Sequence, residues 1–278
     1  MRHIIQISAF AALLFVPFAV QADDYIFANG FEVPSGGGAT GTDFVNDSGA
    51  SACYGSSGYG VPCPNAGFPG QDGDQGRDAE ARQGILAKIG AGLDGFDFTK
   101  VDNLGAPLGP TASQWECVQD NVTGLLWERN VDKVSDARHY RHLYAWYEPA
   151  LADLGVNPGS QGDTDLCNNS LGGAKCNTHN LLQHFNTIGL CGRHDWRLPT
   201  RSELESIRIH GDRYQRMDPD YFSPWGINTS SGSFSYWTSS RYAGSGYSVW
   251  AVNFSSTGTT HGDVPNRNFV RAVSGRSQ

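Results

Sequence analysis

Six cysteines constrain the fold of this chain more than any other feature of its 278 residues. They stand at Cys53, Cys63, Cys117, Cys167, Cys176 and Cys191. Cysteines of exported proteins form disulfides, whereas those of cytosolic proteins stay reduced and more often bind metals or take part in catalysis. The role of these six therefore depends on whether the chain is exported.

Residues 1–22 have the pattern of a cleaved signal peptide. A short positive start is followed by the apolar run 4–20, and Ala22 offers a small residue for cleavage before Asp23. A membrane anchor is the competing interpretation, but an apolar run of about 17 residues broken by Pro17 is short for a membrane span. We expect a secreted, periplasmic or cell-surface protein without a membrane span after cleavage.

An even set of cysteines in an exported chain predicts up to three disulfides. The sequence leaves many pairings open, but proximity suggests Cys53–Cys63 and Cys167–Cys176, which leaves Cys117–Cys191. A zinc site is the alternative, because Cys176 and Cys191 are each followed three positions later by a histidine. The two hypotheses predict opposite thiol states, and export favours disulfides.

Composition favours a loop-rich fold over a helical bundle, because 35 residues are glycine and only 17% are charged. The formal net charge of −8 argues against general affinity for nucleic acid or anionic lipid. It also weighs against wholesale binding of sulfated polysaccharides.

We expect four segments along the chain. They are the signal peptide 1–22, an N-terminal segment and Gly-rich linker 23–42, a Gly/Asp-rich annex 43–114, and a domain 115–278. In the annex, residues 79–89 suggest a brief helix and residues 96–101 alternate like a strand.

Within residues 115–278, the turn signal 120–124 predicts a hairpin of strands 115–118 and 125–128. Helices are expected at 178–188, at 196–209 and in part of 140–154. In the second of these, Pro199 precedes a capping box formed by Thr200 and Glu203. Strands are expected at 236–240, 248–254 and 269–273. Helices followed by antiparallel strands predict an α+β fold.

Three aspartates in the annex, Asp72, Asp74 and Asp78, resemble a calcium loop in charge and spacing. The loop departs from an EF-hand, which needs an oxygen ligand and then glycine where this chain has Gly76 and Arg77. The sequence therefore predicts no cofactor other than a possible calcium ion. The glycine pattern at 90–95 is not expected to bind a dinucleotide, because an alternating strand follows it instead of a helix.

Two surface features suggest ligand binding. Six arginines lie between Arg193 and Arg216, and aromatic residues are dense from Trp225 to Trp250. The arginines suggest a patch for acidic glycans, but the favoured interpretation is that they pair on the helix surface with Asp195, Glu203, Glu205 and Asp212. Exposed aromatic rings stack on sugars, although such residues more often fill a core. We expect Trp250 to lie in the interior, because alternation places it on the same strand face as Val252 and Phe254. The predicted ligand-binding residues are Arg193, Arg201, Arg208, Tyr242 and Tyr247.

A set of motifs resembles the Lcl C-terminal domain family over about residues 115–275. The motifs are Cys117-Val118-Gln119-Asp120-Asn121-Val122-Thr123-Gly124-Leu125-Leu126-Trp127-Glu128, Asp195-Trp196-Arg197-Leu198-Pro199-Thr200 with Glu203-Leu204, Met217-Asp218-Pro219-Asp220-Tyr221-Phe222, Tyr236-Trp237-Thr238-Ser239-Ser240, Val249-Trp250-Ala251-Val252-Asn253-Phe254 and Val270-Arg271.

The resemblance implies a bacterial exported protein with a C-type-lectin-like α+β fold. The family is named for a collagen-like adhesin. For that adhesin, the resemblance implies binding of host glycosaminoglycans and a role in attachment. This chain differs from that adhesin because it is acidic and has no collagen repeat. The family supplies no catalytic residues to carry across.

The leading hypothesis is a secreted or surface-associated, non-enzymatic module that binds carbohydrate or extracellular matrix. No local catalytic motif is present in the sequence, although triads assemble from distant positions. The alternatives are a secreted enzyme or enzyme accessory domain acting on polysaccharide or protein, and a structural envelope protein.

The thiol state of the mature protein tests the disulfide prediction. We expect alkylation without reduction, followed by mass spectrometry, to modify none of the six cysteines, because oxidised sulfurs do not react. Reduction in denaturant before alkylation is the control and should expose all six. Six free thiols in the native protein, or a metal bound in their place, would contradict the prediction.

Overall fold

The computed structural model describes residues 46–210, 217–224, 234–254, 258–264 and 266–275. Its larger sheet has five antiparallel strands. The predicted signal peptide, the linker 23–42, Arg213, Arg216 and Trp225 lie outside the described residues. In spatial order the strands are β12 (Val273–Ser274), β6 (Leu126–Glu128), β5 (Cys117–Asp120), β3 (Phe98–Val101) and β4 (Pro107–Leu108).

The β5–β6 hairpin confirms the turn signal of the sequence. Oδ1 of Asp120 accepts hydrogen bonds from the backbone N–H groups of Val122, at 2.9 Å, and Thr123, at 3.2 Å. Gly124 has φ of 74°, a left-handed conformation that glycine adopts without steric cost. The turn residues therefore fix the register in which Val118 pairs with Trp127.

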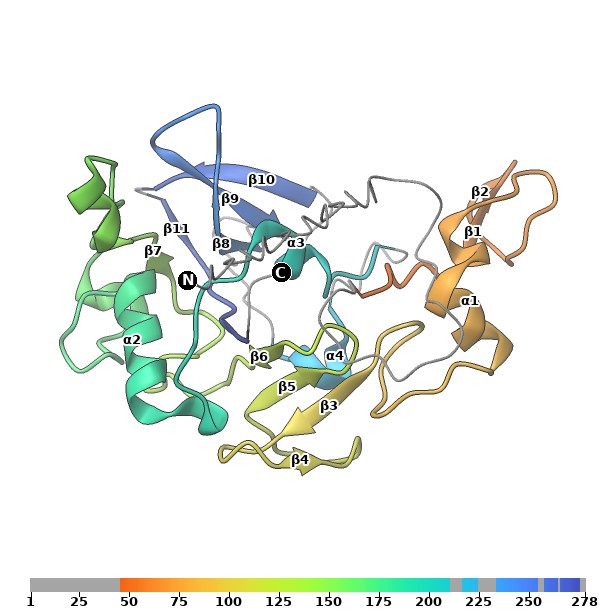
Figure 1. The fold of residues 1–278 in the computed structure, drawn as a ribbon, viewed down its shortest axis with the longest axis horizontal. Coiled ribbons are helices and arrows are strands. Elements are labelled where there is room, and N and C mark those ends of the chain that lie inside the picture. The colour runs from red at the N-terminus through yellow and green to blue at the C-terminus, as the bar shows by residue number, and fades with distance from the viewer. Residues whose placement is uncertain (1–45, 211–216, 225–233, 255–257, 265, 276–278) are drawn as a thin grey trace, which may run out of the picture. The chain divides into compact units, whose positions relative to one another are not determined.

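A second sheet has three antiparallel strands in the order β10–β9–β8, drawn in blue in Figure 1. The strands are β8 (Ser235–Arg241), β9 (Ser248–Asn253) and β10 (Gly258–Asp263). Two further pairs are β7 (Tyr144–Ala145) with β11 (Arg267–Asn268), and β1 (Cys53–Gly55) with β2 (Gly58–Val61). The strands predicted at 236–240 and 248–254 are confirmed. The strand predicted at 269–273 is wrong in extent, because only the short β11 and β12 form there.

The helices are short. They are α1 (Gly76–Gln83), α2 (Thr178–Ile188), α3 (Arg201–Glu205) and α4 (Pro219–Phe222). The 3-10 helices are η1 (Asp72–Asp74), η2 (Pro149–Leu154), η3 (Thr164–Cys167) and η4 (Leu190–Gly192). The described residues include no helix long and apolar enough to cross a membrane. This mixture of short helices and antiparallel sheets confirms the α+β class.

Two of the predicted helices are shorter than expected. The helix predicted at 79–89 ends at Gln83, because Gly84 takes a left-handed φ of 72°. The helix predicted at 196–209 is reduced to α3, because the backbone of Arg197 instead pairs with that of Val273 as an antiparallel bridge. The helix at 178–188 is confirmed and ends, as predicted, at Gly189.

The capping box at the start of α3 is present as predicted. The Thr200 hydroxyl accepts a hydrogen bond from the Glu203 N–H, and the Glu203 carboxylate accepts one from the Thr200 N–H. The same carboxylate receives two hydrogen bonds from Arg197, at 2.7 and 2.8 Å. The start of α3 is therefore held to the segment that pairs with the last strand.

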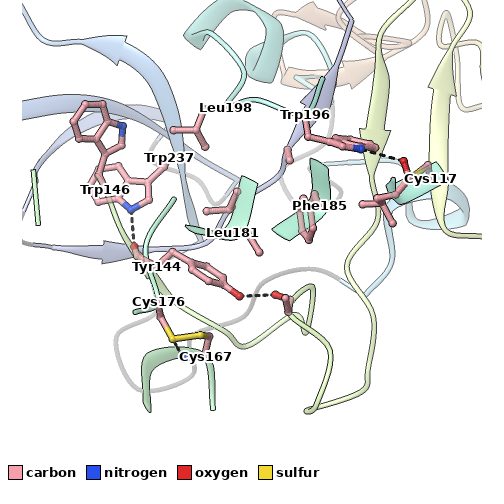
Figure 2. Packing of buried hydrophobic residues seen from close by; sticks show 14 of the residues in the cluster. Cys117, Tyr144, Trp146, Cys167, Cys176, Leu181, Phe185, Trp196, Leu198 and Trp237 are labelled. Carbon is pink, nitrogen blue, oxygen red and sulfur yellow. Dashed lines mark hydrogen bonds between the residues drawn. A yellow bond between two sulfur atoms is a disulfide. The ribbon is translucent and has the colours of Figure 1, made fainter. Parts of the chain in front are cut away.

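One hydrophobic cluster surrounds α2 (Figure 2). Leu181 and Phe185 of α2 pack there with buried tryptophans, whose indole N–H groups all find acceptors. Nε1 of Trp237 donates to the Tyr144 carbonyl at 2.8 Å, and Nε1 of Trp196 donates to the Leu190 carbonyl at 3.0 Å. The buried aromatic residues of this cluster are therefore held in single orientations.

A second cluster joins the five-stranded sheet to the three-stranded sheet, α3 and α4. Its members include Phe96, Phe98, Trp127, Leu204, Phe222, Tyr236 and Val252. Trp237 and Ala251 belong to the first cluster, while Tyr236 and Val252 belong to the second. The three-stranded sheet is thus buried on both faces where Tyr236 and Trp237 of β8 pair with Val252 and Ala251 of β9.

The three disulfides are Cys53–Cys63, Cys117–Cys191 and Cys167–Cys176, the pairing that proximity suggests. Cys117–Cys191 joins β5 to η4 across 74 positions of the chain. The zinc alternative is excluded, because Cys176 and Cys191 are both consumed in disulfides. No free cysteine occurs in the described part of the chain.

The five-stranded sheet crosses the predicted boundary at residue 115. β3 and β4 precede that position, yet β3 pairs with β5 over four residue pairs. Phe96 and Phe98 are fully buried in the second hydrophobic cluster. The annex therefore contributes both strands and core to the fold that follows it.

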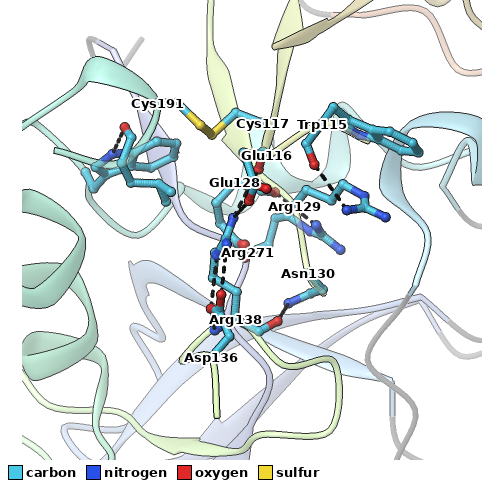
Figure 3. A network of polar contacts seen from close by, with 12 residues as sticks. Trp115, Glu116, Cys117, Glu128, Arg129, Asn130, Asp136, Arg138, Cys191 and Arg271 are labelled. Carbon is cyan, nitrogen blue, oxygen red and sulfur yellow. Dashed lines mark hydrogen bonds and ion pairs between the residues drawn. A yellow bond between two sulfur atoms is a disulfide. The ribbon is translucent and has the colours of Figure 1, made fainter. Parts of the chain in front are cut away.

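A buried polar network lies beside β5 and β6 (Figure 3). Arg138 forms ion pairs with Glu116, at 2.6 Å, and Asp136, at 2.9 Å. Arg271 is fully buried; one of its guanidinium nitrogens donates to the Glu128 carbonyl, and the group lies over the rings of Phe222 and Tyr236. Burial raises the pKa of the Glu128 carboxyl to about 7, although Arg271 and Arg138 oppose the shift.

Glu128 makes stability depend on pH. Its folded-state pKa lies above the ordinary value of 4.5, so its contribution to stability is complete below pH 4.5 and is lost as pH rises toward 7. We expect Glu128→Gln to reduce the slope of the unfolding free energy over this window by up to roughly 1.4 kcal/mol per pH unit. Urea unfolding at several pH values measures the slope. Glu80→Gln, on an exposed face of α1, is the matched control, and an unchanged slope in Glu128→Gln would contradict the assignment.

Candidate functional site

An aromatic platform lies at the end of the three-stranded sheet and consists of Tyr242, Trp250 and His261. The rings of Tyr242 and His261 stack in parallel, with centroids 4.1 Å apart and an interplanar angle of 2°. Trp250 meets Tyr242 edge-on at 5.2 Å and His261 edge-on at 6.1 Å. The platform thus combines one ring that follows β8, one ring from β9 and one ring from β10.

Strand pairing brings the platform together. Trp250 of β9 and His261 of β10 are direct partners in the antiparallel register, so their side chains leave the sheet on the same face. Tyr242 follows β8, and its N–H donates to the Ser248 carbonyl at 3.1 Å. A Cβ at Gly244 would lie 2.6 Å from Cε1 of Tyr242, so the turn after β8 needs glycine for the Tyr242 ring to keep its place.

Arg201 extends the platform from α3. Its guanidinium carbon lies 4.7 Å from the centroid of a Trp250 ring, within cation–π distance. The Arg201 N–H donates to the Ser240 hydroxyl at 3.0 Å, which fixes the start of α3 against β8. Within the described part of the chain, no ion pair joins Arg201 to a carboxylate. This exposed guanidinium is therefore available to a ligand.

A polar cleft of about 360 Å³, termed here the α3 cleft, adjoins the platform through Arg201. Its lining is Asn46, Asp47, Ser48, Arg201, Ser202, Glu205, Ser206 and His210. Burial lowers the pKa of His210, and the nearby Arg208 lowers it further. The cleft thus offers hydroxyl, carboxylate and imidazole groups beside the aromatic rings.

The structure brings together only two of the five predicted ligand-binding residues. Tyr242 and Arg201 both contact the Trp250 side chain. Tyr247 is 67% exposed, as predicted, but makes no ring contact in the described part of the chain. Trp250 is partly exposed, so its predicted interior position is wrong. The strand face that is buried at Val252 opens to solvent two residues earlier.

The other two predicted arginines belong to different surroundings. Arg208 is largely buried and lies 3.4 Å from the Glu205 carboxylate. Arg193 pairs with Asp195 at 3.2 Å and donates from Nε to the Ser274 hydroxyl at 2.9 Å. Local carboxylates and a hydroxyl therefore partner these two arginines separately, and the structure does not bring them into one patch with Arg201.

Arg193 lines another cleft, of about 770 Å³, on the five-stranded sheet. Thr99, Gln119 and Asn121 supply its polar side chains. Their amide N–H groups already donate within the protein: Gln119 to the carbonyls of Asp120 and Leu125, and Asn121 to Asp97 and Thr99. This cleft is larger than the α3 cleft but has fewer free polar groups for a ligand.

The acidic loop forms a cluster of different membership from the one predicted. Carboxylate oxygens of Asp47, Asp72 and Asp78 lie within 4.8 Å of one another, whereas Asp74 lies against the Cys53–Cys63 disulfide. Burial raises the pKa of Asp78 to about 6, and the charge of Asp47 adds to the shift. Calcium binding at this loop stays a prediction.

Sequence reasoning missed His261 as a site residue. Its pairing with Trp250 depends on the register across residues 254–258, which strand patterns alone do not specify. Once the pairing of Gly258 with Asn253 is known, counting three residues along each strand places His261 opposite Trp250.

The family model of the Lcl C-terminal domain matches residues 116–274, more than half of the chain. The chain belongs to this family. The platform, α3 and two of the three disulfides lie inside the Lcl C-terminal domain, whereas β3, β4 and the acidic cluster precede it. No curated protein and no solved structure is similar enough to the chain to match it.

Removing a ring from the platform tests its geometry without any ligand. We expect Tyr242→Ala to keep the fold and to lower the free energy of unfolding by about 1 kcal/mol, because stacked aromatic pairs contribute roughly that much. Tyr247→Ala is the matched control and should change stability by less than about 0.5 kcal/mol, because its ring is exposed. Equal effects of the two changes in urea unfolding would contradict the stacked arrangement.

Proposed function

We propose that this protein is a secreted or surface-associated, non-enzymatic module that binds carbohydrate or matrix polysaccharide through the aromatic platform and the α3 cleft. The observation that carries the proposal is the partly exposed stack of Tyr242 and His261 beside Trp250, with Arg201 over the Trp250 ring and joined to no carboxylate by an ion pair among the described residues.

Sugar rings combine an apolar face of C–H groups with a rim of hydroxyls. Aromatic rings provide a flat apolar surface at low cost in conformational entropy. Polar groups beside the rings then fix orientation, and here these are Arg201, Ser202 and Glu205. A polysaccharide can stack one residue on the platform and extend the next into the cleft.

The family and the cysteines support an exported setting. The Lcl C-terminal domain suggests an extracellular, adhesin-like module. Three disulfides are typical of proteins that work outside the reducing cytosol. Short helices packed on antiparallel sheets are also compatible with the C-type-lectin-like arrangement that we propose for the domain.

The positions of the most perturbed carboxyl groups favour binding over catalysis. Burial raises the pKa of Asp120 to about 6 and that of Glu128 to about 7, values suited to general acids. Both side chains are buried, at 0% and 1% exposure, and so is Asp78, whose pKa burial also raises to about 6. A carboxyl that cannot reach a substrate cannot protonate it.

A glycan array tests the proposal on the mature, folded protein. We expect binding to a subset of glycans and at least tenfold weaker binding by Trp250→Ala, since tenfold corresponds to about 1.4 kcal/mol. Tyr247→Ala is the control with an equally aromatic but isolated side chain. Absence of binding to every glycan, or equal loss in both variants, would contradict the proposal. Turnover of a polysaccharide would support the enzyme alternative instead.

A further inference from the structure

A separate cavity lies between α2, the segment that leads into η2 and the end of β8. Its volume is about 180 Å³. The residues lining this α2 cavity are Trp146, Tyr147, Glu148, Leu151, Thr178, His179, Leu182, Leu198, Ser239 and Arg241. Tyr242, Trp250, His261 and Arg201 do not line the α2 cavity, so this cavity is distinct from the platform.

The inner wall of the α2 cavity is apolar. Leu151, Leu182 and Leu198 line it together with Trp146, whose indole N–H donates to the Thr238 carbonyl at 3.0 Å. Leucine methyl groups neither donate nor accept hydrogen bonds. A sugar would leave hydroxyls unpaired against this wall, which costs free energy. The buried part of a ligand here is therefore apolar.

The mouth of the α2 cavity carries both signs of charge. Arg241 donates from Nη1 to the Asn157 carbonyl at 3.3 Å and from Nη2 to the Gly246 carbonyl at 2.7 Å, so its positive charge is held in place. Glu148 is exposed, and its carboxylate accepts only a long 3.4 Å contact from Ala150 among the hydrogen bonds assigned to it. In the described part of the chain, no ion pair joins Glu148 to Arg241 or to His179.

The start of α2 adds to the positive side of the mouth. Thr178 and His179 are the first residues of this 11-residue helix, and both line the cavity. The positive end of the helix dipole favours a carboxylate there. His179 lies edge-on to Tyr147, with centroids 6.2 Å apart. An anionic group is thus favoured near α2 and Arg241, and a cationic group near Glu148.

We propose that the α2 cavity binds a small zwitterion with an apolar body, of which a free α-amino acid with an aliphatic or aromatic side chain is the simplest example. The ammonium group pairs with Glu148, the carboxylate with Arg241 and His179, and the side chain packs on the leucines. The cavity is smaller than the roughly 300–1,000 Å³ of drug-sized pockets, which suits a ligand with one side chain. The proposal does not depend on glycan binding at the platform.

Isothermal titration calorimetry of the full mature protein tests this with four probes. L-leucine and L-phenylalanine carry both charges, while phenethylamine carries only the ammonium group and 3-phenylpropionate only the carboxylate. We expect saturable binding of at least one amino acid, and at least tenfold weaker binding of both singly charged probes. Methyl glucoside, as the uncharged sugar control, should not bind at this cavity.

Two variants locate the binding. Glu148→Gln should weaken the amino acid at least fivefold and leave 3-phenylpropionate unchanged, because only the ammonium contact is lost. Leu182→Trp should abolish binding of all four probes by filling the cavity. Glu148 is exposed, so its variant keeps the test valid even if Leu182→Trp does not fold.

The outcomes separate this proposal from glycan binding. Tyr242→Ala should retain amino acid binding, because that ring does not line the α2 cavity. No binding of either amino acid at millimolar concentration would overturn the proposal, as would binding unaffected by Glu148→Gln. Loss of glycan binding in Tyr242→Ala with amino acid binding intact would show two independent sites.

Discussion

The ion pair of Arg197 with Glu203 is the interaction on which the arrangement of the domain depends. Glu203 is 5% exposed and accepts hydrogen bonds from Arg197 and from the Thr200 backbone. Burial alone would raise the pKa of this carboxyl, but those hydrogen bonds outweigh it and lower the pKa. Because the backbone of Arg197 also pairs with Val273, one carboxylate joins the start of α3 to the last strand of the five-stranded sheet. Loss of the pair would leave a charge without its partner in the interior, which destabilises proteins strongly.

That junction also explains the position of the platform. α3 begins where Glu203 fixes it, and its first residue, Arg201, then lies over Trp250. The rings themselves come from paired strands, and two of these strands, β8 and β9, are buried on both faces where Tyr236 and Trp237 pair with Val252 and Ala251. The platform is therefore built from paired strands and a capped helix, and such preorganisation would reduce the entropic cost of binding the ligand proposed above.

Local chemistry in the sequence was sufficient for the caps, the hairpin and the disulfide pairing. Thr200 and Glu203 define a helix start within four residues, and Asp120 and Gly124 define a turn within five. Helix ends and surface patches depended on distant partners. The pairing of Arg197 with Val273 prevents the helix predicted at 196–209 from starting at residue 196. Arg193 binds Asp195 and Ser274, whereas Arg208 binds Glu205, so these two arginines do not share one patch. The exposure of Trp250 could not be predicted, because periodicity gives the face of a residue but not how far a neighbouring element covers that face.

The Cys117–Cys191 bond has a consequence for the way this chain responds to proteolysis. Between these two cysteines the chain passes through long loops, including exposed residues near Leu154 and Gly172. A single cut in any of these loops produces two fragments that stay covalently attached, one carrying β5 and the other carrying α3 and the platform. A nicked molecule can thus remain covalently assembled after its backbone is no longer continuous.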